Sequence, residues 1–458
     1  MTHVISVTLA IHATSVTRVI SVIPGTIRSG SPANNARSRI SVSVMPRSGP
    51  IVRPRSPPEI LPRHRRHPLR VCRGKTTRCG RSGHQLQTIP HHPKAMTTAN
   101  SASLEAKTHA AQQQLDAHVR EIIQWHFSPE TGCPFWLDWA KKAGWDPAQE
   151  VKCFADIIAK FPHFQDEWLR DMQPEVWVPR QYKGRPFNIF ETGGTTGMPK
   201  QRIGWEDYKI DYSEFSETLK DEHFPRDHYW LMVGPTGPRR LRLSIEHLAN
   251  VRGCSCYFVD LDPRWVKRVL IDKKYDEAKA YMDHVVDQAV TILTHRKVSA
   301  LFTTPKLLEA LAERIDLHKA GIRGVFCGGT TMDPQYTRFL VEELLENKIG
   351  FVPTYGNTLM GLARHRPLTP ADKYSITYYA PQPRATLRVI NSETDQPVPY
   401  EQWGRVELTT LTKEFFMPRF LERDEAIRRE PIDLYPWDGV AEVRPFGALS
   451  KKIVEGVY

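Results

Sequence analysis

The sequence ETGGTTGMPK occupies residues 191–200 and directly follows a short apolar run, 187–191, that we predict to be a β-strand. Its glycines let the backbone turn so that successive N–H groups point inward and form a nest for an anion. The hydroxyls of Thr195 and Thr196 add hydrogen-bond donors, and Lys200 adds a positive charge. Phosphate oxygens need this combination. The loop is not a Walker A motif, because Met-Pro follows the third glycine where that motif has Lys and Ser or Thr. The alternative is an ordinary glycine-rich turn.

Downstream of this loop, short apolar runs alternate with helical patterns. We predict strands at residues 256–259, 300–303, 324–327 and 350–353, and helices at 244–251, 274–296, 306–314 and, capped by Asp333, up to 347. Strands and helices in strict alternation are typical of an α/β fold, with a parallel sheet covered by helices. Ligands bind at the carboxyl ends of such strands. The Gly/Thr-rich turns after the strands should therefore meet at one edge.

The two ends of this region have different patterns. Residues 101–126 form an amphipathic helical pattern, and an aromatic stretch at 133–137 is expected to pack as an anchor. From residue 385 onward, segments 385–390 and 405–409 alternate like half-buried antiparallel strands. We therefore expect a small antiparallel subdomain at about 380–458.

The positive charge of the chain is concentrated in residues 1–95. The formal net charge is +12, but this segment holds fourteen Arg and two Lys against one acid, Glu59, so residues 96–458 carry a net charge of −3. The leader is rich in Ser, Pro, Arg and His and cannot bury enough apolar surface to fold alone. It is interpreted as a basic disordered leader that is not native to the protein, a targeting segment, or a disordered tail. Nucleic-acid binding is not expected for the core.

The seven cysteines show no metal-ligand spacing, so a structural zinc site is not expected, and their odd number favours a reducing, cytoplasmic location. No run approaches the ~18 apolar residues that a membrane-spanning helix needs.

Five motifs in residues 187–438 together resemble the adenylate-forming superfamily, which includes acyl-CoA synthetases, luciferases and peptide-synthetase adenylation domains. Thr192–Lys200 resembles its phosphate loop, and Gly328-Gly329-Thr330 its adenine-contacting turn. Tyr355-Gly356-Asn357-Thr358 resembles the motif whose tyrosine stacks on adenine. Residues 404–407 resemble its Gly-Glu-Leu strand, and Asp438 occupies the place of the aspartate that holds the ribose hydroxyls.

This resemblance implies the large domain of an AMP-forming ligase, which activates a carboxylic acid with ATP and Mg²⁺ and releases pyrophosphate. It assigns catalytic roles to Thr195, Thr196 and Lys200. The implied nucleotide-binding residues are Thr192, Gly193, Gly194, Thr195, Thr196, Gly197, Lys200, Gly328, Gly329, Thr330, Tyr355, Gly356, Asn357, Thr358 and Asp438. Residues 191–197, 261–265 and the ending 454–458 resemble the phenazine antibiotic biosynthesis branch, which is similar to phenylacetate-CoA ligases. That branch implies an aromatic, phenazine-like acid as substrate.

Two departures from the family pattern leave a second interpretation open. Leu359 stands where the family has a glutamate that helps to hold Mg²⁺, and leucine cannot ligate a hard cation, so the metal ligands are unknown. Only twenty residues follow Asp438, so we expect the C-terminal lid domain and its lysine to be absent. Such a chain is a ligase whose partner is an acyl acceptor or a separate protein that supplies the lid. The alternative is a catalytically weak pseudo-enzyme that binds nucleotide.

Arg239, Arg240 and Arg242 form a further candidate. They either bind the substrate carboxylate or form the solvated start of a helix. Glu191 has no explanation at this stage, because an unpaired carboxylate beside a phosphate loop would repel ATP.

Overall fold

The computed structural model describes residues 97–193 and 198–447. The leader at 1–95, the ending at 454–458 and four candidate residues of the phosphate loop, Gly194, Thr195, Thr196 and Gly197, lie outside the described residues.

The centre of the molecule is one mixed sheet of eleven strands in the order β10-β11-β12-β13-β9-β8-β7-β6-β5-β3-β4. The strands of the main sheet are β3 (Tyr229–Gly234), β4 (Ser255–Asp260), β5 (Val298–Thr303), β6 (Gly324–Gly328), β7 (Gly350–Asn357), β8 (Gly361–His365), β9 (Thr377–Tyr379), β10 (Ala385–Ile390), β11 (Trp403–Leu411), β12 (Phe416–Arg429) and β13 (Gly439–Pro445).

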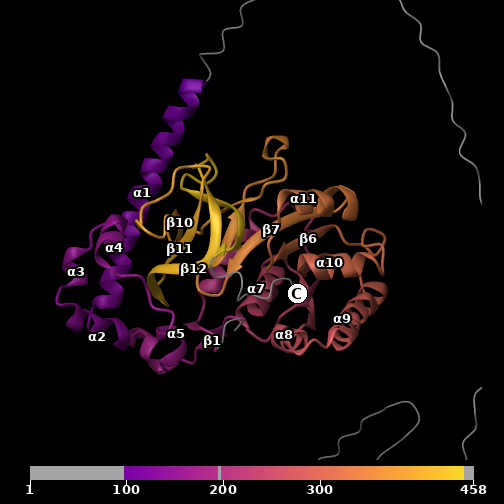
Figure 1. The fold of residues 1–458 in the computed structure, drawn as a ribbon, viewed down its shortest axis with the longest axis horizontal. Helices are drawn as coiled ribbons and strands as arrows, with labels where there is room; N and C mark the ends of the chain where they lie inside the picture. The colour runs from indigo at the N-terminus through magenta and orange to yellow at the C-terminus, as the bar shows by residue number, and fades with distance from the viewer. Residues whose placement is uncertain (1–96, 194–197, 448–458) are drawn as a thin grey trace, which may run out of the picture. The chain divides into compact units, whose positions relative to one another are not determined.

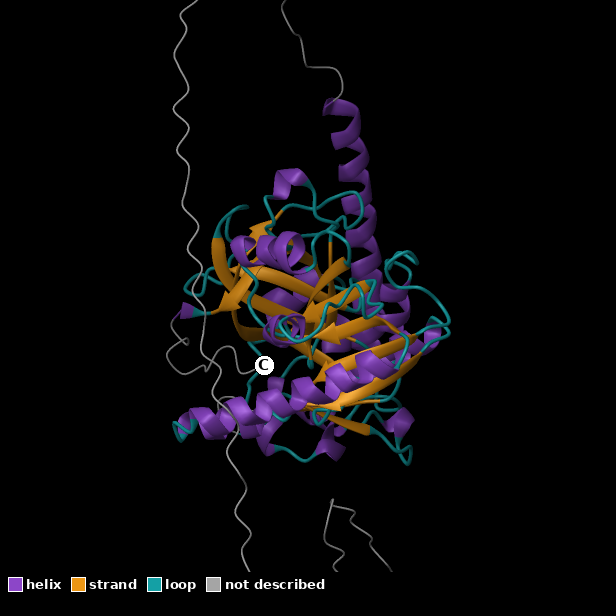
Figure 2. Cartoon of the chain, turned by 90° about the vertical axis from the view of Figure 1, so that its right-hand side faces the viewer, coloured by secondary structure: helices purple, strands orange, loops and turns teal. Residues whose placement is uncertain are grey.

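Strands β3 to β7 run parallel to one another and are called the parallel half here. Helices cover both of its faces (Figures 1 and 2). Leu231 and Val233 of β3 pack into the cluster that contains residues of α9 (Tyr275–His295) and α10 (Pro305–Ala312). Trp230 and Met232 pack into the cluster that contains residues of α6 (Asp207–Ser216) and α7 (Arg240–Val251). This alternation follows from the two-residue period of a strand that is buried on both faces. The sequence-based prediction of a helix-covered parallel sheet is confirmed here.

The helices match most of the predicted positions. They are α1 (Thr97–Phe127), α2 (Pro134–Ala143), α3 (Pro147–Glu150), α4 (Phe154–Lys160), α5 (Trp168–Asp171), α6 (Asp207–Ser216), α7 (Arg240–Val251), α8 (Pro263–Ile271), α9 (Tyr275–His295), α10 (Pro305–Ala312) and α11 (Pro334–Arg338), with short 3₁₀ or π turns at Pro174–Trp177, Arg180–Tyr182, Phe339–Leu344 and Pro370–Asp372. The side chain of Asp333 caps α11 by accepting a hydrogen bond from the Tyr336 amide.

Strands β8 to β13 pair antiparallel and are called the antiparallel half. The structure differs here from the expected set of packed parallel-sheet subdomains. The β7 strand continues to Asn357 and turns directly into β8, with which it pairs antiparallel, so both halves share one hydrogen-bonded surface. Tyr355, Gly356 and Asn357, which we expected in a loop, therefore lie within a strand.

The N-terminal helices pack against the antiparallel half. Leu115, Val119, Ile122 and Ile123 of α1 are buried in the larger core cluster, as their spacing predicted. In the aromatic stretch that follows, Trp136 is buried and its indole nitrogen donates to the carbonyl of Phe416 on β12. This stretch is therefore an anchor for the sheet, as expected.

A separate two-stranded hairpin carries the phosphate-loop sequence. β1 (Asn188–Glu191) pairs antiparallel with β2 (Gln201–Gly204), with Glu191 opposite Gln201. The loop thus joins two strands of a hairpin and does not follow a strand of the main sheet. In the part of the chain that the structure describes, no helix has the length and apolar character needed to span a membrane.

Candidate functional site

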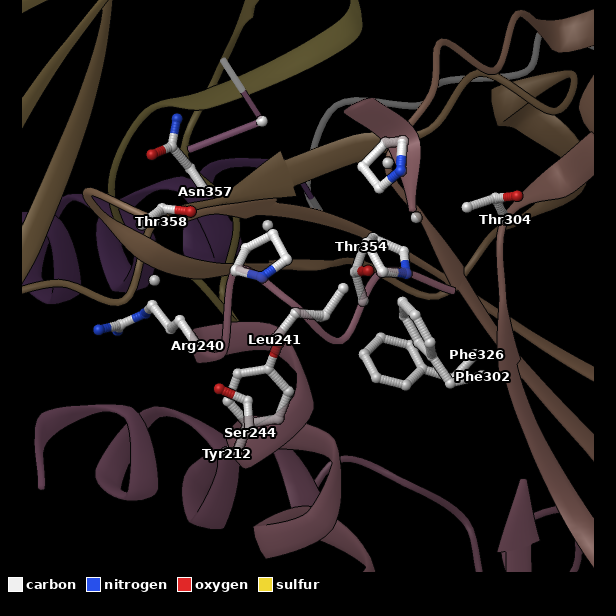
Figure 3. Close-up of a pocket in the computed structure, with 18 of the residues that line it drawn as sticks. Tyr212, Arg240, Leu241, Ser244, Phe302, Thr304, Phe326, Thr354, Asn357 and Thr358 are labelled. Atoms are coloured by element: carbon white, nitrogen blue, oxygen red, sulfur yellow. The ribbon is translucent and has the colours of Figure 1, made fainter. Parts of the chain in front are cut away.

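A cavity of about 220 Å³ opens at the carboxyl ends of the parallel strands (Figure 3). It is lined by Glu191, Gly193, Tyr212, Pro235, Pro238, Arg240, Leu241, Ser244, Pro263, Phe302, Thr304, Phe326, Gly328, Gly329, Thr354, Gly356, Asn357, Thr358 and Gly361. Described residues of all three motif turns therefore meet at one pocket, as the strand order predicted. Of the candidates from the sequence, the pocket gathers Gly193, Gly328, Gly329, Gly356, Asn357 and Thr358.

Glycines form the rim of this pocket. Gly328 and Thr354 are partners in the β6–β7 ladder, so the two turns that follow these strands lie next to each other. Gly329 has a φ of +96°, a left-handed conformation that favours glycine. A Cβ atom added to Gly356 would meet no atom within 4 Å, so it would project into open space. The rim therefore offers backbone groups and room for a ligand to approach them closely.

The floor of the pocket is aromatic. Phe302 and Phe326 meet edge to face, with ring centroids 5.0 Å apart, and Tyr212 lies 6.5 Å from Phe326. All three rings are at most 5% exposed and belong to the core cluster between the sheet and helices α6 and α7. Ser244, on α7, lies beside Tyr212 in Figure 3. The cavity thus runs from a polar backbone rim to an apolar floor that is fixed by core packing.

Thr192 and Lys200 are hydrogen-bonded to each other at the ends of the two hairpin strands. The Thr192 amide donates to the Lys200 carbonyl, and the Lys200 amide donates to the Thr192 hydroxyl, both over 3.0 Å. The Lys200 side chain is buried, with Nζ 3.1 Å from a carboxylate oxygen of Asp166 and 4.5 Å from the centre of the Phe420 ring. Burial of Asp166 opposes its ionisation, but Lys200 and Arg170 hold the pKa of that carboxyl below its usual value. The structure therefore places the ammonium group of Lys200 in an ion pair with Asp166.

Glu191 is paired. Its carboxylate accepts a hydrogen bond from Arg264 at the start of α8, over 3.0 Å. This pairing answers the question that the sequence left open, because a neutralised carboxylate at the mouth of the pocket repels an anion much less.

Tyr355 faces away from the pocket, toward two carboxylates of β12. Its neighbours on β7, Thr354 and Gly356, line the pocket, whereas the Tyr355 hydroxyl donates to Asp424 over 2.7 Å. Asn357 donates to Glu422 over 2.6 Å. Burial and, to a smaller extent, the nearby Glu422 raise the pKa of Asp424 to about 6, and the hydrogen bond from Tyr355 opposes this rise. Glu422 and Asp424 were missed in the sequence analysis, although two acids spaced i, i+2 in a strand share one face.

Asp438 and Thr330 lie elsewhere. The Asp438 carboxylate accepts hydrogen bonds from Arg428, at 2.8 Å, and from the Tyr400 hydroxyl, at 3.0 Å. Neither Asp438 nor Thr330 is among the residues that line the pocket.

Arg240 lies at the inner end of a buried ion network. It is 4% exposed and contacts Asp207 and Asp211 of α6, each over 3.1 Å, while Arg202 and Arg384 bind the same two carboxylates. Burial would raise the pKa of Asp207, but Arg202 and Arg240 hold it below its usual value. Burial prevails at Asp211 and raises its pKa to about 6. Arg240 is therefore not the solvated start of a helix: it is buried against structural partners, and it also lines the pocket.

Leu359 is a core residue. Its side chain is 1% exposed, and its carbonyl oxygen accepts hydrogen bonds from Arg202 and Thr410. Among the described residues, no group of three or more His, Cys, Asp or Glu side chains is arranged to hold a metal ion. Glu191 is the one carboxylate among the described pocket-lining residues, and it is bound to Arg264. The side chains that the structure describes thus give no basis for a reaction step through Mg²⁺.

Solved structures of 2-hydroxyisobutyryl-CoA ligase share this architecture. The ligase in the postadenylation state, in complex with R3-HIB-AMP, matches with a TM-score of 0.53 and 14% sequence identity over 74% of this chain and 68% of that chain. An open conformation in complex with 2-HIB-AMP and CoA matches with a TM-score of 0.51 and 14% identity over 73% and 69%. The chain therefore has the fold of these ligase structures. At this level of identity the likeness establishes the fold and leaves the reaction to be argued from the site. No protein-family model and no curated protein sequence matches the chain.

Proposed function

We propose that this protein activates an aromatic carboxylic acid with ATP. A carboxylate oxygen of the acid attacks the α-phosphorus, the bond from that phosphorus to the bridging oxygen breaks, and pyrophosphate leaves with the electron pair, so that acyl-AMP forms. The observation that carries the proposal is the convergence of the hairpin and the two glycine turns on one pocket with an aromatic floor. A phenazine-like acid remains the specific substrate suggested by the sequence resemblance.

The β7 strand divides the proposed site in two. Thr354 and Gly356 face the pocket, which we assign to the acid. Tyr355 faces Asp424, and Asn357 contacts Glu422, so we assign this side to the nucleoside. Tyr355 would hold adenine on this side, and the 328–330 turn, whose Gly328 and Gly329 also line the pocket, would hold it from the rim. For the ribose hydroxyls, Asp438 is the residue proposed from the sequence and Asp424 is the carboxylate that contacts Tyr355.

The protein would act by positioning and electrostatics, because the acid itself is the nucleophile. We propose that Thr192 to Gly197, with the hydroxyls of Thr195 and Thr196, hold the phosphates. Lys200 would add its charge from beneath the loop, where it lies beside Asp166.

The first experiment is ATP–pyrophosphate exchange by the full chain, with a panel of aromatic acids of one, two and three rings that includes phenazine-1-carboxylic acid. We expect exchange that depends on one class of acid and falls by about 10²–10³ in Lys200→Met, the usual cost of losing one electrostatic contact to the transition state. Lys209→Met is the matched control, since Lys209 is a surface lysine paired with Glu206. Asp424→Asn and Asp438→Asn, compared side by side, identify the ribose carboxylate.

A nucleotide-binding pseudo-enzyme is the second candidate. The ion pair of Lys200 with Asp166 favours it, because a lysine that is held by a carboxylate gives less charge to a phosphate. Saturable ATP binding by calorimetry, with no exchange for any acid, would establish this candidate and exclude the first.

A further inference from the structure

The floor of the pocket holds a polar group in apolar surroundings. Ser244 is 1% exposed, and its hydroxyl has no hydrogen-bond partner among the described residues. The Tyr212 phenol is close enough for a weak hydrogen-bonding interaction with Ser244 that opposes the rise in the phenol's pKa caused by burial, but the contact falls short of the geometry of a formed hydrogen bond. Buried hydroxyls are normally paired, because an unmade hydrogen bond in the interior is costly.

Ser244 has not taken the partner that a helix usually provides. A serine within a helix can donate to the carbonyl four residues earlier, which here is that of Arg240. No such bond forms, and α7 exposes Ser244 to the cavity together with Leu241 (Figure 3). A bound ligand is therefore the natural partner for this hydroxyl.

The position of this hydroxyl within the pocket defines the part of the ligand that it meets. The rim at Gly329 and Gly356 is exposed, whereas Tyr212, Ser244 and Phe326 are each at most 5% exposed. A carboxylate directed at the phosphates lies at the rim, so the opposite end of the acid reaches Ser244. Around Ser244 the pocket is lined by Leu241 and by Phe302 and Phe326 of the aromatic floor, which suit the faces and edges of an aromatic ring.

We infer that the substrate is an aromatic acid that carries an oxygen substituent, a hydroxyl or a keto group, at the end remote from its carboxylate, and that Ser244 and Tyr212 bind this substituent. The inference rests on the proposed function and narrows it. Both side chains can donate and accept, so they pair with either form of oxygen. A site built in this way disfavours the analogue that lacks the oxygen, because its own hydroxyl then stays unpaired.

The test compares acids in matched pairs: benzoic with 4-hydroxybenzoic acid, 2-naphthoic with 6-hydroxy-2-naphthoic acid, and phenazine-1-carboxylic acid with its hydroxylated forms. In the pair whose size fits, we expect kcat/KM for exchange to be up to about tenfold higher for the hydroxylated acid, which is near the upper end of the value of one net hydrogen bond. In Ser244→Ala this ratio should fall by about fivefold to tenfold, while kcat/KM for the unsubstituted acid changes less than about twofold. Tyr212→Phe should act in the same direction.

Thr386→Val is the matched control. Thr386 also has a buried hydroxyl without a partner among the described residues, but it lies on β10 and does not line the pocket. Equal ratios in Ser244→Ala, Thr386→Val and the unchanged protein would overturn the role of Ser244, and a preference for the unsubstituted acid in every pair would overturn the inference itself.

Failure of the proposed function is distinguishable from failure of this inference. If no acid supports exchange, calorimetric binding of the same pairs to the full chain decides the question. Tighter binding of a hydroxylated acid that is lost in Ser244→Ala upholds the inference without adenylation. Equal binding within every pair overturns it.

Discussion

The parallel and antiparallel halves of the main sheet are stabilised by different interactions. Every residue of β5 and β6 is buried, and their side chains are apolar or small, so hydrophobic packing on both faces holds the parallel half. The antiparallel half buries charges as well. Glu407 on β11 is 1% exposed and contacts Arg388, at 2.5 Å, and Arg419, at 3.2 Å.

This difference corresponds to the two sides of the proposed site. The parallel half supplies glycine turns and an aromatic floor, which define a shape. The antiparallel half supplies the carboxylates of Glu422 and Asp424, which set charge beside Tyr355. The comparison teaches that a single sheet can provide the shape of a pocket from its parallel half and charged side chains from its antiparallel half, because the strand direction changes after β7.

The strongest test of this comparison removes the charges that join the halves. Arg240 lies on α7 beside the parallel half, and it shares Asp211 with Arg384, which precedes β10. We expect Arg240→Met to lower the free energy of unfolding by about 3–5 kcal/mol, because it removes one of the two arginines that hold each of the buried carboxylates Asp207 and Asp211. Denaturant unfolding of the full chain measures this loss.

Arg242→Met is the control for this substitution. Arg242 lies two residues along the same helix, its side chain is half exposed, and its nearest acid is 4.0 Å away, so a change within about 0.5 kcal/mol is expected. A loss below about 1 kcal/mol in Arg240→Met would mean that the two halves are stable without this network.

A pH titration sharpens the comparison at Asp424. Its pKa is about 6 in the folded protein, above the usual value of about 4 in an unfolded chain, so the folded state binds the extra proton between these pH values. Stability should therefore fall as the pH rises from about 4 to about 6, by about 1–3 kcal/mol from this group. Asp424→Asn, which keeps an acceptor for Tyr355, should remove that part of the loss and be the more stable protein at pH 7.

Two further outcomes decide this prediction. Asp438 is an ion-paired carboxylate on the same half, so Asp438→Asn should not remove the loss of stability between pH 4 and 6. Parallel stability curves for Asp424→Asn and the unchanged protein across this range would show that Asp424 titrates normally.

The sequence predicts the parallel half better than the antiparallel half for a physical reason. Each strand–helix unit there carries its own signals, such as an apolar run or a capping residue like Asp333, and these signals act over a few residues. In β12, by contrast, Arg419 is stabilised by the carbonyl of Phe161 and by Asp395, which are distant in sequence. When the charged residues of a strand are paired by residues distant in sequence, the local sequence pattern does not predict the strand.

The same limit applies to the site. The glycines that line the pocket could be predicted, because a few neighbouring residues are enough to show that a glycine after a strand forms a turn. The partners of Lys200 and Tyr355 could not, because Asp166 and Asp424 lie in other elements and their approach depends on the fold. Ser244 was likewise indistinguishable in the sequence from a surface serine of an amphipathic helix.

The smallest expected effect tests the rim of the pocket, where the parallel half carries its own charge pair. Glu191 and Arg264 are 35% and 48% exposed, so their separation should cost at most about 1 kcal/mol of stability. Arg264→Ala nevertheless leaves a carboxylate facing the proposed phosphates. We expect KM for ATP to rise by about threefold to fivefold at low salt, less at high salt, with little change in kcat.

A second substitution that restores KM for ATP would show that the effect of Arg264→Ala comes from the charge of Glu191. Glu191→Gln in the Arg264→Ala background should return KM to near its original value, because the repelling charge is gone. Arg314→Ala, a surface arginine paired with Asp283 and Asp287, is the matched control and should leave KM unchanged. If the double variant keeps the high KM, Arg264 contacts the nucleotide directly, and charge as well as shape would then come from the parallel half.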